Sequence, residues 1–204
     1  MDFERAEDLF RQLADMVDYP IFEDTPRYDV SATLAVTSMQ FGASVRVLCA
    51  EGLLLGAATV LRSQFEAVVR SVWALYRATD GQIGKLSVEL SAEAQQAGKT
   101  LPSVYEMMNE LEKFPQLANL LISLKEFKES SWMPLNSFTH SGIHAVHWTK
   151  NEPSPKVLGS VFRASNGMNL LAFMHLGILT GQPTVQSEMI AVTASFSSCL
   201  PERR

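Results

Sequence analysis

The stretch from Gly52 to Asp80 limits the fold most, because its residues suit a long helix that is packed on more than one side. At helical spacing one face is apolar, and it comprises Leu54, Leu61, Phe65, Val68, Val72, Leu75 and Tyr76. A neighbouring stripe comprises Thr59, Arg62, Glu66, Arg70, Trp73 and Arg77. The third side comprises the small residues Ala58, Ser63, Ala67, Ala74 and Ala78. The sequence therefore predicts a central helix with neighbours on two sides.

Other segments repeat apolar residues at the same helical spacing, and short loops with Gly or Pro separate them. The run that follows Asp29 also alternates like a strand, but its helical spacing continues well beyond strand length. Besides the central one, the expected helices are 2–18, 29–52, 83–97, 101–111, 117–127, 156–180 and 185–200. The prediction is an all-α, up-and-down helical bundle of about seven or eight helices.

A chain of 204 residues fits one domain with a substantial core. We expect a single helical domain over 1–204, with an N-terminal helix and connection over 1–28 and a polar tail over 200–204. Charged residues make up only 19% of the chain, which suggests that another subunit covers part of the surface.

The net charge of -5 argues against non-specific nucleic-acid binding, so any such contact needs a local arginine cluster. The acidic N-terminus lacks the features of a signal peptide. Arg46 and Glu51 interrupt the most apolar window, 41–61, which excludes a membrane span there. Cys49 and Cys199 are read as free core thiols, with one long-range disulfide as the alternative. A soluble cytoplasmic protein is expected.

The segment LNSFTHSGIHAVHW holds three of the four histidines. If it is helical, one narrow face carries Asn136, His140, His144, His147 and Asn151. Three interpretations fit this face: a solvated polar surface, a metal site, or acid–base and phosphate chemistry. The metal site lacks the glutamate of an HExxH motif, so Glu66 from another helix would have to complete it. The fourth histidine, His175, lies among apolar residues and is interpreted as a core histidine.

Arg62, Glu66 and Arg70 follow one another at intervals of four residues on the central helix. A carboxylate between two guanidinium groups forms a fixed ladder, whose spare N–H donors can bind a phosphate. The same spacing also describes an ordinary exposed ion-pair face that adds little stability.

Two stretches, LRSQFEAVVRSVWALY and SFTHSGIHAV, resemble an uncharacterised bacterial helical family with an Arg-x-x-x-Glu-Ala helix and a Thr-His-x-Gly segment. That family is similar to the HEPN superfamily, whose members are typically dimeric helical bundles and often metal-independent ribonucleases. Their active pattern places an Arg four to six residues before a His. Here His140 matches the histidine, whereas Met133, Pro134 and Leu135 precede it, so Arg62 or Arg70 would have to supply the positive charge.

The resemblance implies an HEPN-like homodimer in bacterial defence or stress, acting as a metal-independent ribonuclease or an RNA- or nucleotide-binding relative. In that reading His140 is the general acid or base and His144 assists it. The expected phosphate- or substrate-binding residues are Arg62, Glu66, Arg70, Asn136 and His147. Neither a cofactor nor a bound metal is expected, and a partner protein of a defence system is a further expectation. The alternatives are a non-catalytic homodimeric interaction protein, in which these residues form a structural polar seam, and a His-cluster metal hydrolase.

Overall fold

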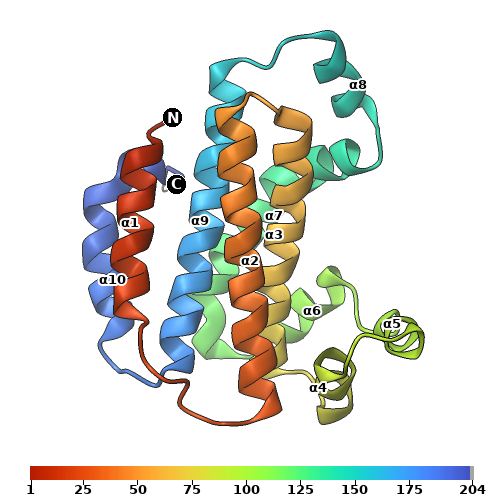
Figure 1. Cartoon of the computed structure of the whole chain (residues 1–204), viewed down its shortest axis with the longest axis vertical. Coiled ribbons are helices and arrows are strands. Elements are labelled where there is room, and N and C mark those ends of the chain that lie inside the picture. Colours follow the sequence, from red (N-terminus) through yellow and green to blue (C-terminus); the bar gives the residue numbers. More distant parts are fainter. Residues whose placement is uncertain (203–204) are drawn as a thin grey trace.

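The computed structural model describes residues 1–202, and every regular element within them is a helix, which confirms the all-α prediction (Figure 1). The described part holds ten α-helices, more than the seven or eight predicted. The α-helices are α1 (Phe3–Met16), α2 (Pro26–Ala50), α3 (Leu54–Tyr76), α4 (Asp80–Ser87), α5 (Ala92–Gly98), α6 (Val104–Leu111), α7 (Ala118–Thr139), α8 (Ile143–Lys150), α9 (Pro155–Leu179) and α10 (Val185–Thr193). Two 3₁₀ turns, Pro115–Leu117 and Ala194–Cys199, precede α7 and follow α10.

The centre of the molecule is a layer of three long helices, α2, α3 and α9, with α3 buried as the sequence predicts. Helices α2 and α3 are antiparallel and are joined by a tight turn at Gly52, whose φ is +72°. In this turn the amide of Leu53 donates to the carbonyl of Leu48, and that of Gly52 donates to the carbonyl of Cys49. These two bonds form a Schellman motif, which favours glycine at the left-handed position.

Polar side chains are buried between these three helices, and they pair with one another. The Nε2 group of Gln64 donates to the Oδ1 atom of Asn169 at 2.9 Å, and the hydroxyl of Ser165 donates to the Oε1 atom of Gln64 at 2.7 Å. A Cβ atom at Gly42 would collide with Gln64 and Asn169, so glycine is what lets α2 approach this pair. Because Gln64, Ser165 and Asn169 satisfy one another only when α3 and α9 lie in this register, their pairing helps to fix the register of the two helices.

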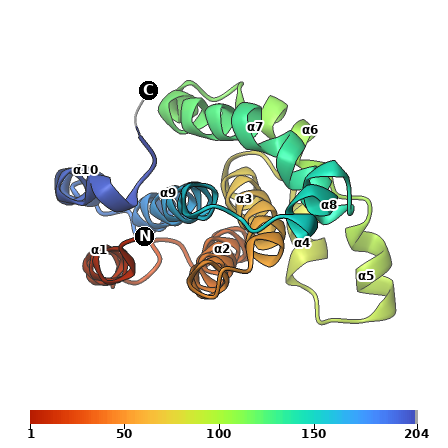
Figure 2. The same cartoon turned by 90° about the horizontal axis from the view of Figure 1, so that it is seen from above.

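The remaining helices cover the two sides of this layer (Figure 2). Helices α6, α7 and α8 contact α3 on one side, whereas α1 and α10 pack beside α9 on the other. The side chain of Arg27 closes the end of α3 by donating to the carbonyls of Ala74 and Ala78 at 2.8 and 2.7 Å.

Three segments differ from the expected helices. In the expected helix 185–200, α10 ends at Thr193 and a 3₁₀ turn follows it. The predicted helix 83–97 is two helices, because capping side chains start each one: Thr79 begins α4 and Ser91 begins α5, while Val88 between them is extended. Helix α7 runs on from the predicted 117–127 through Pro134 and ends at Thr139.

Cys49 and Cys199 are buried and unpaired, in agreement with the prediction of free core thiols. Of the predicted polar tail, Leu200 packs into the core, and residues 203–204 lie outside the described part of the chain. Within residues 1–202 no helix has the length and apolar character required to cross a lipid bilayer.

Candidate functional site

The candidate site centres on the guanidinium of Arg62, a half-buried side chain of α3 that contacts three groups. Its Nε atom lies 3.1 Å from the Oε1 atom of Glu66, one turn further along the helix. Its Nη1 atom lies 3.2 Å from the Nε2 atom of His140 at the end of α7. Its carbon Cζ lies 5.0 Å from the centre of the Trp132 ring. The arginine therefore connects α3 to the C-terminal end of α7.

The turn between α7 and α8 places His140 at this point. His140 is the C-cap of α7, and Ser141 follows in the left-handed conformation with φ of +53°. The amide of Gly142 donates to the carbonyl of Ser137 at 2.6 Å, and that of Ser141 donates to the carbonyl of Phe138, which completes a second Schellman motif.

The side chain of Ser137 ties the two helices together across this turn. Its hydroxyl accepts from the backbone amide of His144 at 3.0 Å, so a residue of α7 caps the first turn of α8. A Cβ atom at Gly142 would lie 2.6 Å from the Ser137 hydroxyl oxygen, which makes glycine the residue that fits there.

The contact between Arg62 and His140 defines the hydrogen-bonding state of the imidazole. A guanidinium can only donate, so Nε2 of His140 accepts and the ring is neutral, with its proton on Nδ1. The His140 side chain is exposed. An arginine has five N–H donors, and the bonds to Glu66 and His140 use two, which leaves three. A cation with spare donors beside an exposed base is a combination that suits an anionic phosphodiester.

Burial of the ion pair limits the freedom of both partners. Only 20% of the Arg62 side chain and 31% of the Glu66 side chain are exposed to solvent. Glu66 offsets the charge of Arg62 and fixes the orientation of its guanidinium. The site therefore offers a ligand oriented N–H donors, and it carries little excess positive charge.

The single histidine face predicted for 136–151 is wrong, because the turn at 140–142 divides it between two helices. His147 is exposed on α8 and its ring packs edge-on against Trp148 at 4.8 Å, away from the Arg62 contacts. His144 and Asn136 are half-buried at the turn, where the Nδ1 atom of His144 and the Oδ1 atom of Asn136 lack a hydrogen-bond partner within residues 1–202.

The predicted ladder on α3 forms only in its first half. Within residues 1–202 Glu66 pairs with Arg62 and not with Arg70, whose Nε atom is buried without a partner. Trp73 does not join the polar stripe either: it is fully buried and its indole N–H donates to the Oε2 atom of Glu110 at 2.7 Å. Trp73 is buried because α6, which carries Glu110, packs against this part of α3.

Trp132 and Ser137 are site residues that the sequence reasoning missed. The available signal was spacing, because Trp132, Asn136 and His140 recur at intervals of four and share one row of a helix. Pro134 hid this signal, since it reads as a helix break.

Within residues 1–202 no three His, Cys, Asp or Glu side chains come together in a way that could hold a metal ion. His140 and His147 in particular belong to different helices with different neighbours. His140 and His147 are therefore not placed to bind one metal ion together.

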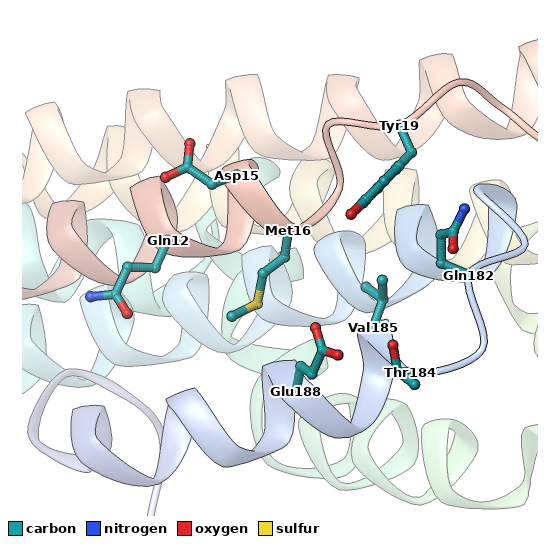
Figure 3. A pocket seen from close by; sticks show the side chains of 8 residues that line it. All are labelled: Gln12, Asp15, Met16, Tyr19, Gln182, Thr184, Val185 and Glu188. Carbon is teal, nitrogen blue, oxygen red and sulfur yellow. The ribbon is translucent and has the colours of Figure 1, made fainter.

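A hollow of about 380 Å³ lies elsewhere, between α1 and α10 (Figure 3). Asp15 and Glu188 supply carboxylates to its wall, and Met16 and Val185 supply apolar surface. An acidic hollow repels a phosphate, so its chemistry differs from that of the contacts around Arg62.

Residues 35–202 match the sequence profile of a family described as a family of unknown function, DUF6988. That match spans the helices that carry Arg62 and His140 and leaves out α1. No curated protein and no solved structure matches the chain.

Proposed function

The chain belongs to the DUF6988 family of unknown function, and we propose that it binds an RNA phosphodiester at Arg62 and cleaves it with His140 as general base and acid. The observation that supports this most is the 3.2 Å contact between the Nη1 atom of Arg62 and the Nε2 atom of exposed His140. It brings a phosphate-binding cation and a titratable group together from positions 78 residues apart in the chain.

Substrate binding changes this contact. A phosphate oxygen is a stronger acceptor for a guanidinium than a neutral imidazole is, because that hydrogen bond is formed between opposite charges. A bound phosphodiester therefore takes the donor from His140, and the lone pair on its Nε2 atom becomes free. Glu66 keeps its bond to Nε and holds the guanidinium in place.

The freed nitrogen then accepts the proton of a ribose 2′-hydroxyl. The 2′-oxygen bonds to phosphorus and the bond from phosphorus to the 5′-oxygen breaks, which leaves a cyclic phosphate on one product. The imidazolium returns its proton to the departing 5′-oxygen, so His140 ends in its starting state. The three N–H donors of Arg62 that have no hydrogen-bond partner within residues 1–202 stabilise the charge on the phosphate oxygens.

The decisive experiment compares wild type with His140→Ala on a single-stranded RNA, in the presence of a chelator. We expect His140→Ala to lower the cleavage rate about 100-fold or more, the range typical of a lost general acid or base. The melting temperature should hardly change, because the side chain is exposed. An RNA with one deoxyribose at the scissile position should resist cleavage by wild type.

Lys150→Ala is the matched control, since it removes an exposed cation of α8 that makes no contact with Arg62. It should cleave like wild type. Equal cleavage by wild type and His140→Ala would refute the catalytic role and would point to a contaminating nuclease.

A second candidate is a non-catalytic interaction protein in which the same residues form a structural polar seam. The observation that favours it is that Glu66, His140 and Trp132 all engage Arg62, which fastens α3 to the end of α7. In that case Arg62→Ala would lower the free energy of unfolding or the stability of a homodimer, and no preparation would cut RNA. The resemblance to HEPN proteins, a homodimer and a role in defence or stress stay predictions.

A further inference from the structure

A column of aromatic rings runs from the core of the molecule to the guanidinium of Arg62. Phe127 of α7 stacks on Phe65 of α3 with ring centres 4.8 Å apart. The ring of Trp132 packs edge-on against that of Phe65, with ring centres 5.8 Å apart. The Cζ atom of Arg62 lies over the same Trp132 ring, 5.0 Å from its centre. Phe65 is fully buried, so the base of the column is fixed by the core.

The three contacts of Arg62 differ in what a phosphate can displace. The bonds to Glu66 and His140 lie along the N–H edges, where a phosphate also binds. The contact with Trp132 is a cation–π contact, in which the Cζ atom of Arg62 lies over the indole ring, 5.0 Å from its centre. The indole ring accepts neither of the N–H bonds that Glu66 and His140 accept. It is therefore the contact that persists when a phosphate takes the donor from His140.

We propose that Trp132 is a positioning residue, which holds the guanidinium of Arg62 in place so that the N–H donors not used by Glu66 and His140 are already positioned for a phosphate. The inference rests on the proposed phosphate-binding function of Arg62. Holding the guanidinium in place matters because a mobile arginine side chain loses rotamer freedom on binding, and a side chain that is already ordered avoids that loss.

The simpler role for Trp132 is to fill space between α3 and α7. The two roles differ in what the ring must provide: filling space needs only volume, whereas holding a cation needs an aromatic face. Trp132→Leu keeps an apolar side chain and removes the face, and Trp132→Phe keeps a face of smaller size.

The test measures two properties of each variant. The first is the Nε–Hε resonance of Arg62 in an NMR spectrum, which senses the aromatic ring and the order of the side chain without any RNA. The second is the dissociation constant for a short single-stranded RNA made uncleavable by deoxyribose. We expect Trp132→Leu to shift and sharpen the Arg62 resonance toward that of a mobile side chain and to weaken RNA binding about threefold to thirtyfold.

Trp132→Phe should retain most of the resonance shift and bind RNA within about twofold of wild type. In an Arg62→Ala background, Trp132→Leu should cause no further loss of binding, because the effect acts through Arg62. An Arg62 resonance that stays the same in Trp132→Leu would overturn the positioning role, as would equal losses in the Leu and Phe variants. Wild type that binds no RNA would refute the proposed function, whereas the resonance would still decide the role of Trp132.

Discussion

At the scale of single residues, the core histidine shows how burial controls chemistry. His175 is 1% exposed, and its Nε2 atom lies 2.8 Å from the hydroxyl of Ser31, which donates to the carbonyl of Ser71. The prediction of a core histidine is confirmed. Its hydrogen bonding is satisfied only at Nε2, because Nδ1 is buried without a partner within residues 1–202. Burial lowers the pKa of His175 from 6.5 to about 4, although a hydrogen bond to Ser71 acts in the opposite direction.

This lowered pKa makes the stability of the fold depend on pH. The unfolded chain takes up a proton at His175 below about pH 6.5, whereas the folded protein takes it up only near pH 4. The contribution of a neutral His175 is therefore complete above pH 6.5 and is lost as the pH falls toward 4. We expect the free energy of unfolding, measured with urea, to decrease over this window by at most about 1.4 kcal/mol per pH unit from this group.

His175→Gln is the matched variant, because its amide can pair with Ser31 and does not titrate in this window. Its stability should fall less steeply with decreasing pH than that of wild type. The same slope in both proteins would assign the acid sensitivity to other groups.

At the scale of elements, α2 and α7 both end in a Schellman motif, but different residues occupy the left-handed position. Helix α2 ends with Gly52 in the left-handed position, where glycine has no steric cost. Helix α7 ends with Ser141 in that position and Gly142 one residue later. The second end thus carries local strain, and the tertiary contact of Ser137 with α8 stabilises it.

Substitutions at this second end should have opposite effects. Gly142→Ala places a methyl group against Ser137 and is expected to lower the free energy of unfolding by about 1–3 kcal/mol. Ser141→Gly relieves the left-handed strain, so stability should stay constant or rise by up to about 1 kcal/mol. Thermal unfolding followed by circular dichroism measures both.

The same two variants should also differ in RNA cleavage and binding. Gly142→Ala displaces the turn that carries His140, so cleavage should drop further than binding, whereas Ser141→Gly should resemble wild type. A destabilised Gly142→Ala that cleaves RNA normally would show that the turn does not position His140.

At the scale of the whole molecule, the helices α1 and α10, which contribute to stability, lie apart from the candidate site. Helix α1 and α10 lie on the side of α9 away from α7 and α8 (Figure 2). Phe3 and Phe10 of α1 contact Phe162 and Phe173 of α9 at ring-centre distances of 4.8 and 6.1 Å. Arg46 of α2 lies over the Phe10 ring, and burial lowers the pKa of its guanidinium.

Phe10→Ala tests this separation. We expect a loss of about 3–5 kcal/mol in the free energy of unfolding, as for other buried phenylalanines. Binding of the uncleavable RNA by the protein that is still folded at low temperature should equal that of wild type. A weakened affinity without unfolding would mean that the two sides of the molecule are coupled.

The sequence by itself determined the helices and the burial of α3, because helical periodicity is a property of neighbouring residues. It also determined the core position of His175, since that depends on the apolar residues around it in the chain. It failed at 83–97 and at 140–142, where capping side chains and a left-handed serine end helices without a strong break in the pattern.

Only the tertiary structure decided which polar groups meet. Arg62 pairs with His140 and Gln64 pairs with Asn169 because of the register in which the helices cross, and spacing within one helix does not encode that register. The same register leaves Arg70 and His147 outside the contacts of Arg62, although the sequence spacing of both residues fits the predicted site equally well. Side-chain partners are a property of the packed molecule, whereas helices are largely a property of the chain.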